Sequence, residues 1–416
     1  MTRPAAIPFA EALGIAKLKI KAYDGSSAGA DVPIGIRVNR PRAAADLLHS
    51  PGELGLARAF AAGDMTVFGV PEGDPYEVLA ELDDMGDHRP PASAFLHLGM
   101  VAGRDLLHRS PRLEIEMPPR WRRLKRGLRH SKARDAEAIR HHYDVSNEFY
   151  ANVLGPSMTY TCAVFDTTQQ SLTDAQENKY RLVFDKLALQ PGDRLLDVGC
   201  GWGGMVRFAA ERGVRTLGVT LSKPQADWGQ QAIEEAGLGH LAEVRYLDYR
   251  DVDEDQFDAV SSIGLTEHIG LANYPDYFQF LASRLRDGGL LLNHCITRPD
   301  NHWGTHPDSF MDRFIFPDAE LASPGRVVSA IHDNGFEVRH EENLREHYAL
   351  TLSHWNHNLA AHWDECVGEA GISTCRIWAI YLAGSRLGFE QNDLQLHQVL
   401  AVKGRARLPM RPWWRP

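Results

Sequence analysis

The sequence predicts an α/β protein whose central element is a doubly wound, mostly parallel sheet. Three observations support this prediction. The apolar run Leu195–Val198 leads directly into a glycine-rich loop, Gly199–Gly204, and a helix-forming stretch follows the loop. Further apolar strands alternate with helical segments as far as residue 294, and distinctive polar residues lie where those strands end. Strand, glycine loop and helix in this order form the ligand crevice of such sheets.

Composition and charge limit the class of protein. The 416 residues predict two or three domains, and a net charge of −10 argues against nucleic-acid binding. No apolar run approaches the roughly 18 residues of a membrane span, and the N-terminus lacks a secretory signal. Five scattered cysteines without a C-x-x-C pair favour a reducing cytoplasm. We expect no metal site, because none of the 19 histidines shows H-E-x-x-H spacing.

Residues 1–90 are expected to form a small α/β module. Two stretches alternate apolar and polar residues as half-buried strands do, and two others have helical character. The expected elements are strands at residues 18–23 and 34–38 and helices at residues 43–49 and 54–62. No group of catalytic residues is visible in this module.

Residues 91–140 are expected to be a linker that ends in a basic amphipathic segment. Nine basic and two acidic residues lie between Arg120 and Arg140. Trp121, Leu124 and Leu128 recur among them at helical spacing. In an acidic chain, such a segment is typical of attachment to an anionic membrane surface. A solvated helix face is the alternative, and the pattern alone favours neither.

Residues 141–416 are expected to hold the main domain. Its expected strands are residues 194–199, 215–221, 244–247, 257–263, 289–294 and 395–402. Residues 301–390 predict a largely helical insertion. The most distinctive residues follow strands, which places them at the crevice: Asp248-Tyr249-Arg250, Thr266-Glu267-His268 and Asn293-His294-Cys295.

The end of the second strand indicates which ligand the crevice binds. NAD-binding folds place Asp or Glu there to hold the ribose hydroxyls, but this strand ends in Thr220-Leu221-Ser222. The NAD interpretation is therefore weakened. A tight corner that binds no ligand is the plain alternative to a nucleotide site.

The stretch Gly218–Gln225, G-V-T-L-S-x-x-Q, resembles the cyclopropane-fatty-acyl-phospholipid synthases and the mycolic acid methyltransferases. Four further segments extend the resemblance over about residues 130–403: T-Y-T-C-A, T-E-H-I-G, N-H-C-I-T and H-Y-A-L-T-L-S-H-W. The resemblance implies a class I S-adenosylmethionine (SAM)-dependent methyltransferase sheet, with the helical insertion as a lid over a long acyl chain. It also implies that the N-terminal module presents lipid or dimerises.

The resemblance implies two sets of site residues. Those for SAM are Tyr160, Thr161, Gly199, Gly201, Thr220, Leu221, Gln225, Tyr249 and Arg250. Those for a bicarbonate ion, the expected active-site base, are Cys162, Glu267, His294, the backbone of Ile296, and Tyr348. Glu267 alone could be a surface carboxylate, and His294 alone a core histidine. Together at adjacent strand ends, they form an acid–base pair.

The implied reaction is C-methylation of a double bond in an unsaturated phospholipid acyl chain, through a carbocation. The chain is most similar to an actinomycete branch that makes 10-methylene chains, which a partner reductase then reduces. Three departures put the product in doubt: Val164 and Thr266 replace residues that are usually aromatic, and Asn293 replaces an apolar one.

Three other functions stay open from the sequence. They are a cyclopropane synthase, a small-molecule SAM methyltransferase, and a lipid-binding protein that keeps an inactive methyltransferase fold. The expected location is the cytoplasm, with peripheral attachment to the inner face of the cell membrane. A homodimer is left open.

Overall fold

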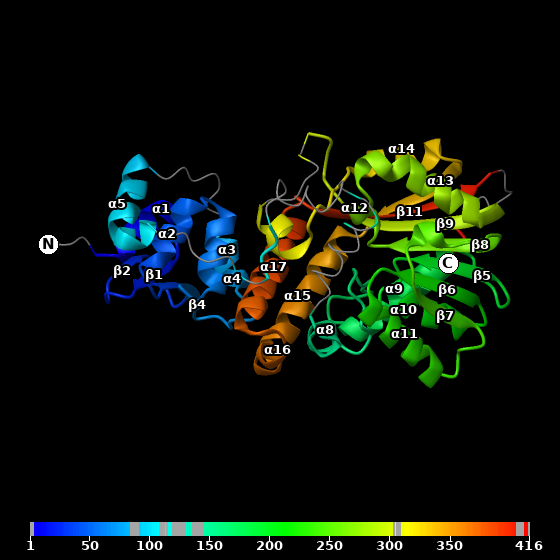
Figure 1. Cartoon of the computed structure of the whole chain (residues 1–416), viewed down its shortest axis with the longest axis horizontal. Helices are drawn as coiled ribbons and strands as arrows, with labels where there is room; N and C mark the ends of the chain where they lie inside the picture. The colour runs from blue at the N-terminus through cyan, green and yellow to red at the C-terminus, as the bar shows by residue number, and fades with distance from the viewer. Residues whose placement is uncertain are drawn as a thin grey trace. The chain divides into compact units, whose positions relative to one another are not determined.

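The computed structural model describes residues 4–83, 91–107, 113, 115–118, 130, 132, 134, 145–302, 304, 309–404 and 412–414. Most of the predicted basic segment, including Trp121, Leu124 and Leu128, lies outside the described residues. The chain divides into two compact units (Figure 1). The small-sheet unit comprises Met1–Pro118, Asp308–Ile315 and Leu352–Leu387, and the large-sheet unit comprises Pro119–Pro307, Phe316–Thr351 and Gly388–Pro416.

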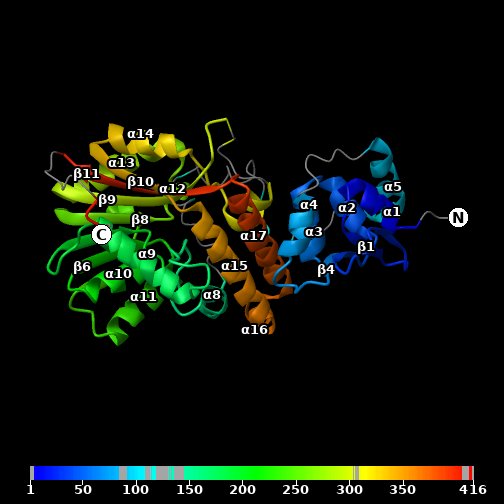
Figure 2. The ribbon, with the colours of Figure 1, turned by 180° about the vertical axis from the view of Figure 1, so that it is seen from behind.

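The large-sheet unit is built on a seven-stranded sheet with the order β10-β11-β9-β8-β5-β6-β7. Its strands are β5 (Arg194–Val198), β6 (Arg215–Thr220), β7 (Ala242–Tyr246), β8 (Phe257–Ile263), β9 (Leu285–Thr297), β10 (Phe336–Asn343) and β11 (Gln395–Lys403). The five strands from β9 to β7 are parallel, whereas β11 runs antiparallel between β9 and β10 (Figure 2). The predicted doubly wound α/β fold is confirmed, and at one edge β11 is antiparallel to both of its neighbours, β9 and β10.

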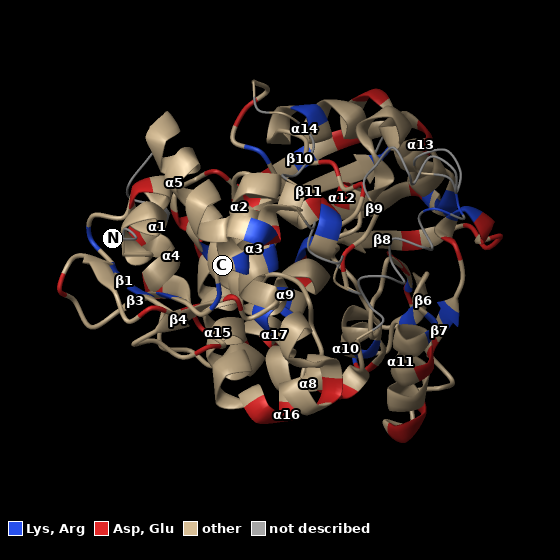
Figure 3. Ribbon diagram, turned by 60° about the vertical axis from the view of Figure 1, so that its left-hand side comes forward, with Lys and Arg blue, Asp and Glu red and all other residues tan. Residues whose placement is uncertain are grey.

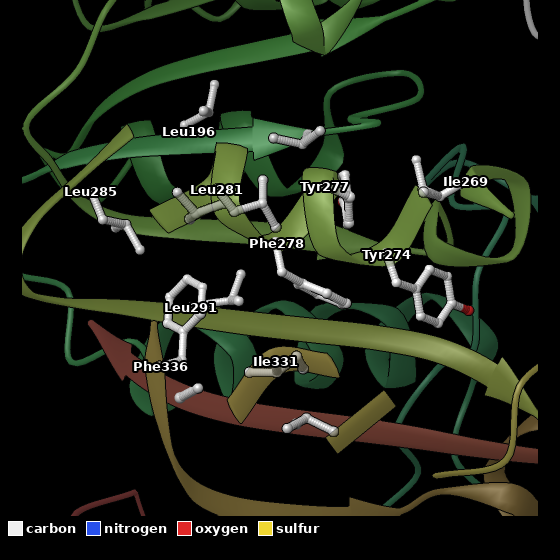
Figure 4. Packing of buried hydrophobic residues seen from close by; sticks show 14 of the residues in the cluster. Leu196, Ile269, Tyr274, Tyr277, Phe278, Leu281, Leu285, Leu291, Ile331 and Phe336 are labelled. Atoms are coloured by element: carbon white, nitrogen blue, oxygen red, sulfur yellow. The ribbon is translucent and has the colours of Figure 1, made fainter. Parts of the chain in front are cut away.

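Helices cover both faces of this sheet. On one face, apolar side chains of α9 (Leu172–Lys186), α10 (Gly204–Ala210) and α11 (Lys223–Glu235) join two buried clusters with the strands. On the other face, α13 (Tyr274–Arg284) and α14 (Pro324–Asp333) close a larger cluster, in which Phe278 and Leu281 pack near Leu291 (Figure 4). Burial on both faces explains why the strands are near-continuous apolar runs in the sequence.

Serine caps set where two of these helices begin. The Ser171 hydroxyl accepts a hydrogen bond from the Asp174 backbone amide at 3.1 Å, and α9 begins there. The Ser222 hydroxyl likewise accepts a hydrogen bond from the Gln225 backbone amide at the start of α11. The cap at Ser222 therefore holds Gln225 at the carboxyl end of β6. The unit also contains α8 (Asn147–Leu154), α12 (Thr266–Ile269), and short 3₁₀ turns at Tyr249–Asp251 and Leu271–Asn273.

The small-sheet unit has a four-stranded sheet with the order β2-β1-β3-β4. Its strands are β1 (Lys19–Ala22), β2 (Ser27–Gly29), β3 (Gly35–Val38) and β4 (Met65–Phe68). Its first helices are α1 (Ala6–Leu13), α2 (Arg42–His49), α3 (Glu53–Ala61), α4 (Tyr76–Asp83) and α5 (Ala92–Ala102), with a 3₁₀ turn at Gly103–Leu107. The predicted strands correspond to β1 and β3 and the predicted helices to α2 and α3. The short strands β2 and β4 were not predicted.

Part of the predicted helical insertion packs with the small-sheet unit. Asn356 donates to the Gly73 carbonyl at 3.2 Å, and Ser373 donates to the Ala61 carbonyl at 3.0 Å. The grouping of residues 352–387 thus differs from the predicted one, which placed all of 301–390 in the main domain. The insertion contains α15 (Arg345–Ala361) and α16 (Trp363–Ala370), which His362 separates, and α17 follows at Ile372–Glu390. A five-residue π-helix occupies Met311–Ile315.

Two features are absent from the described residues. Across the described part of the chain, no helix is both long and apolar enough to cross a membrane. Nor do the described His, Cys, Asp and Glu side chains form a group of three that could hold a metal ion. All five cysteines are buried and free.

Candidate active site

The loop after β5 bends around an open cleft. Gly199, Gly201 and Gly203 have φ angles of 79°, 54° and 74°, a region that side chains with a Cβ rarely adopt. A Cβ added to Gly201 would meet no heavy atom within 4 Å, so this side of the loop faces empty space. The loop therefore offers bare backbone to a ligand, as expected at the switch point of a doubly wound sheet.

The cleft encloses about 540 Å³ of space, a figure that includes the open solvent at its mouth. Five of the residues predicted to bind SAM line it: Tyr160, Thr161, Gly199, Gly201 and Gln225. Thr220 supports one of them, because its hydroxyl donates to the Gln225 side-chain oxygen at 2.9 Å. Segments far apart in the sequence thus meet in one cleft.

Three other predicted SAM residues are not among those that line the cleft: Leu221, Tyr249 and Arg250. The Tyr249 ring packs edge-on against Tyr277 and Phe280, with centroid distances of 5.2 and 5.3 Å. The Arg250 guanidinium forms an ion pair with Asp248 at 2.6 Å. Both residues lie just beyond the carboxyl end of β7, and their predicted contact with SAM stays a prediction.

Sequence reasoning missed a buried lysine in the cleft wall. Lys179 on α9 is 1% exposed, and its ammonium donates to the Thr161 hydroxyl at 3.1 Å. Burial lowers the pKa of Lys179 to about 7, against the opposing influence of Asp197 and Cys162. Burial also raises the pKa of Asp197 to about 6, although Ser261 donates to this carboxylate at 2.6 Å. The signal was present in the sequence, because Lys179 lies on the buried stripe of α9.

Glu267 lies at the carboxyl end of β8, on the short helix α12. Its Oε1 accepts a hydrogen bond from the backbone amide of Ile296 at 2.7 Å, so two predicted site residues meet directly. Burial raises the pKa of Glu267 to about 7, against the hydrogen bond from Ile296. Its Oε2 is buried without a hydrogen-bond partner among the described residues. This carboxyl group can therefore hold or release a proton near neutral pH and still has an oxygen available for a ligand.

His294 lies on β9, two residues before Ile296, and is 1% exposed. Its Nδ1 is 3.1 Å from the side-chain amide nitrogen of Gln398 on β11. Burial, together with the positive charges of Lys179 and Lys186, lowers the pKa of His294 well below its usual value. Its Nε2 is a second buried atom with no hydrogen-bond partner in the described part of the chain.

Cys162 and Tyr348 both lie around the start of α15. The Cys162 thiol points to the carbonyls of Ala163 and Leu344, at 3.1 and 3.9 Å. Burial raises the pKa of this thiol, which excludes a thiolate nucleophile at neutral pH. Tyr348 is buried in the first turn of α15, and its ring centroid lies 4.5 Å from that of Phe389. The predicted contact of these two residues with a bicarbonate ion stays a prediction.

Two of the three departures from the family pattern form one buried pair. The Thr266 hydroxyl donates to the Asn293 side-chain oxygen at 2.7 Å, and both residues are fully buried. Asn293 in turn donates to the Cys295 sulfur at 3.4 Å. The polar replacements on β9 and α12 therefore satisfy one another. The backbone amide of Val164, the third departure, donates to the Ala175 carbonyl.

Comparison with known proteins gives a family and several relatives. Residues 130–399 match the family model described as mycolic acid cyclopropane synthetase. A probable fatty acid methyltransferase of Mycobacterium tuberculosis is 57% identical over 97% of this chain and 96% of its own. One from Pseudomonas putida is 38% identical over 93% of this chain and 92% of its own.

Solved structures resemble about two thirds of the chain. A cyclopropane synthase from Mycobacterium tuberculosis has a TM-score of 0.61 and 31% identity, covering 64% of this chain and 98% of its own. A mycolic acid cyclopropane synthase complexed with SAH and CTAB has a TM-score of 0.60 and 33% identity, with the same coverage.

Proposed function

The chain belongs to the mycolic acid cyclopropane synthetase family and is a SAM-dependent methyltransferase, and from this premise we propose its substrate and product. The substrate is an unsaturated fatty acyl chain carried by a phospholipid. The enzyme methylates one carbon of the double bond, and the product is a 10-methylene branched chain. Cyclopropane formation on the same substrate is the second candidate, because the solved relatives are named cyclopropane synthases.

The observation that carries this proposal is the pair of buried atoms, Oε2 of Glu267 and Nε2 of His294, that lack hydrogen-bond partners among the described residues. Buried polar atoms are nearly always hydrogen-bonded, so such atoms indicate a polar ligand. Their chemistry fits a small oxyanion such as bicarbonate. The bare glycine loop and the cleft that it lines fit SAM.

The residues around these ligands exclude water and hold protons. When bound, SAM supplies the methyl group and bicarbonate accepts the proton that the methylated chain loses. An alkene is a poor nucleophile, so orientation and a dry site must supply most of the rate. Glu267 and His294 lie in a dry site, because they are only 7% and 1% exposed. A solvated small-molecule site would not need such burial.

The choice of product depends on the step after methyl transfer. Transfer to one alkene carbon leaves a cation on its neighbour. Immediate loss of a proton from the new methyl closes a cyclopropane, whereas a prior hydride shift moves the cation to the methylated carbon and leads to C=CH2. Aromatic faces stabilise nearby cations. Because Thr266 and Asn293 form a polar pair where the family usually has an aromatic and an apolar residue, we expect the cation to be held differently and deprotonated later.

The product can be tested by feeding oleate deuterated at both alkene carbons to cells that express the chain. A methylene product is expected to carry both deuterium atoms on the carbon adjacent to the branch, as located by fragmentation mass spectrometry. A matched culture expressing the Glu267→Gln variant should leave the oleate unmodified. Cyclopropane as the sole product, with one deuterium on each of the two former alkene carbons, would identify an ordinary synthase.

We also propose that the enzyme attaches peripherally to the inner face of the cell membrane. The basic segment at residues 120–140 supports this, although most of it lies outside the described residues. In the small-sheet unit, Leu96, Met100 and Leu107 are 68%, 65% and 81% exposed, and exposed apolar groups are typical of lipid or partner contacts. Acidic residues lie on α16 and at the C-terminal end of α11 (Figure 3). Those surfaces therefore do not favour contact with an anionic leaflet.

Replacing Arg122, Arg123, Lys125 and Arg126 with Gln is expected to weaken binding to anionic vesicles by about 1 kcal/mol per residue, and to make it less dependent on salt. The measurement is vesicle sedimentation at two salt concentrations. A control with the same change in charge replaces Arg215, Lys223, Arg286 and Arg339 with Gln. Activity on detergent-dispersed lipid should survive in both variants. Equal sedimentation of wild type and the first variant would make the segment a solvated face.

Two further proposals concern partners. A methylene branch is an alkene, so a separate reductase would be the class of enzyme that converts it into a methyl branch.

The small-sheet unit supplies either a lipid-presenting surface or a dimer contact. The two cyclopropane synthase structures cover 64% of this chain, whereas the Mycobacterium tuberculosis fatty acid methyltransferase matches 97% of it.

A further inference from the structure

A chain of three buried side chains lies behind His294 in the large-sheet unit. Lys186, the last residue of α9, donates to Oε1 of Gln398 at 2.6 Å. The Nε2 of Gln398 lies 3.1 Å from Nδ1 of His294. Gln398 is directly opposite His294 in the register between β11 and β9. Lys186 and Gln398 are 0% exposed and His294 is 1% exposed, so water does not compete for these contacts.

The lysine decides how the amide of Gln398 is oriented. The oxygen and nitrogen of a glutamine side chain are hard to distinguish by shape, but an ammonium can only donate hydrogen bonds. The group that accepts from Lys186 must therefore be the oxygen of Gln398. Its NH2 group then faces His294. Lys186 also forms an ion pair with Glu342 at 2.7 Å.

The amide in turn decides where the proton of His294 lies. An NH2 group donates, so Nδ1 of His294 must accept and carries no proton. In the neutral ring the single proton is then on Nε2. Protonating Nδ1 as well would place two donors against each other, beside the positive charges of Lys179 and Lys186. Burial and these charges lower the pKa of His294, in agreement with a neutral ring.

We propose that Gln398 and Lys186 are positioning residues that fix His294 as its neutral Nε2–H tautomer, so that His294 donates a hydrogen bond to an oxyanion in the active site and does not act as the base. The oxyanion part of this statement rests on the proposed function, whereas the tautomer does not. Nε2 is the buried atom that lacks a partner among the described residues, and as N–H it requires an acceptor. A small oxyanion would supply that acceptor.

The tautomer is tested by NMR of the full-length protein with ¹⁵N-labelled histidine rings, with His294 assigned from the signals lost in a His294→Gln variant. We expect a protonated Nε2 and an unprotonated Nδ1 in the wild type. This readout needs neither substrate nor SAM, so it still holds if the proposed substrate is wrong. A proton on Nδ1, or on both nitrogens, would overturn the proposal.

The Gln398→Glu variant tests the role of the amide. A carboxylate of the same shape still accepts from Lys186, but it now accepts from Nδ1–H, so the proton of His294 should move from Nε2 to Nδ1. Methyl transfer should fall roughly 10²-fold or more in kcat, as expected for a histidine in the wrong tautomer, with a smaller change in KM. Gln395→Glu, the same change on the same strand, is the control and should behave as wild type.

A second variant guards against failure of the first to fold. In Lys186→Gln, the neighbour of Gln398 can both donate and accept, so the amide loses its fixed orientation. His294 should then show both neutral tautomers, with a partial loss of kcat. An unchanged Nε2–H signal in both folded variants would show that His294 is positioned by other groups and would overturn the proposal.

Discussion

Glu267→Gln is expected to lower kcat by roughly 10³-fold or more, the range found when a positioned acid–base group is lost. The variant keeps the side-chain shape, and its remaining oxygen can still accept the hydrogen bond that Ile296 donates at 2.7 Å. Only the ability to carry a charge or exchange a proton is lost. Steady-state kinetics on detergent-dispersed phospholipid would measure the effect. Glu337→Gln, on the edge strand β10, is the matched control and should leave kcat unchanged.

The same variant should be more stable than wild type at high pH. Because burial raises the pKa of Glu267 from 4.5 to about 7, the native state keeps a proton that the unfolded chain releases above 4.5. The free energy of unfolding of the wild type therefore falls as pH rises from 4.5 through about 7. The Gln side chain of the variant does not titrate, so the variant does not show this fall. We expect a gain of up to about 3 kcal/mol at pH 8, shrinking towards pH 5. A variant that is inactive and equally destabilised at both pH values would indicate misfolding, not lost chemistry.

Gly201→Val is expected to abolish SAM binding. The Gly201 φ of 54° disfavours a branched side chain, and the space beside its Cα is the open cleft that SAM would occupy. Isothermal titration calorimetry should show a loss of at least about 10²-fold in affinity, or about 3 kcal/mol. Unchanged affinity would remove the glycine loop from the SAM site.

Gly237→Val separates strain from obstruction. Gly237 has a φ of 70° and also has no heavy atom within 4 Å of an added Cβ, but it lies in the turn between α11 and β7 and does not line the cleft. This control should lose a similar amount of stability, which thermal unfolding would report. Its SAM affinity should match that of wild type. If both variants lost SAM binding equally, backbone strain would explain the result for Gly201.

Sequence patterns predicted three central parallel strands well because these strands are buried on both faces. The predicted first and last residues of β8 match the observed ones, and those of β5 and β6 lie within one residue of the observed ones. β10 was missed for the opposite reason. It is an edge strand in which only alternate residues are partly covered, and charged side chains such as Glu337 and Arg339 hide its pattern.

The site was predicted in part. Motif resemblance indicated residues that the structure does bring together, such as Glu267 with Ile296. It could not indicate Lys179 or Lys186, because a lysine within a helix is usually solvated. Their spacing held the information, since both lie with Ala175 and Val183 on the buried stripe of α9. Cross-strand pairing, which places Gln398 opposite His294, requires the register of two strands more than 100 residues apart and cannot be derived from local pattern.

The central position of β11 has a consequence for how the chain folds during synthesis. β11 follows every other strand of the large sheet in chain order, yet it lies between β9 and β10. Until it leaves the ribosome, the 13-residue strand β9 has an unpaired edge, and that edge is a template for aggregation. Because Gln398 on β11 contacts His294, we expect the sheet and the site around His294 to be completed together, after β11 has been synthesised. A nascent chain that ends before β11 is therefore expected to have no catalytic activity.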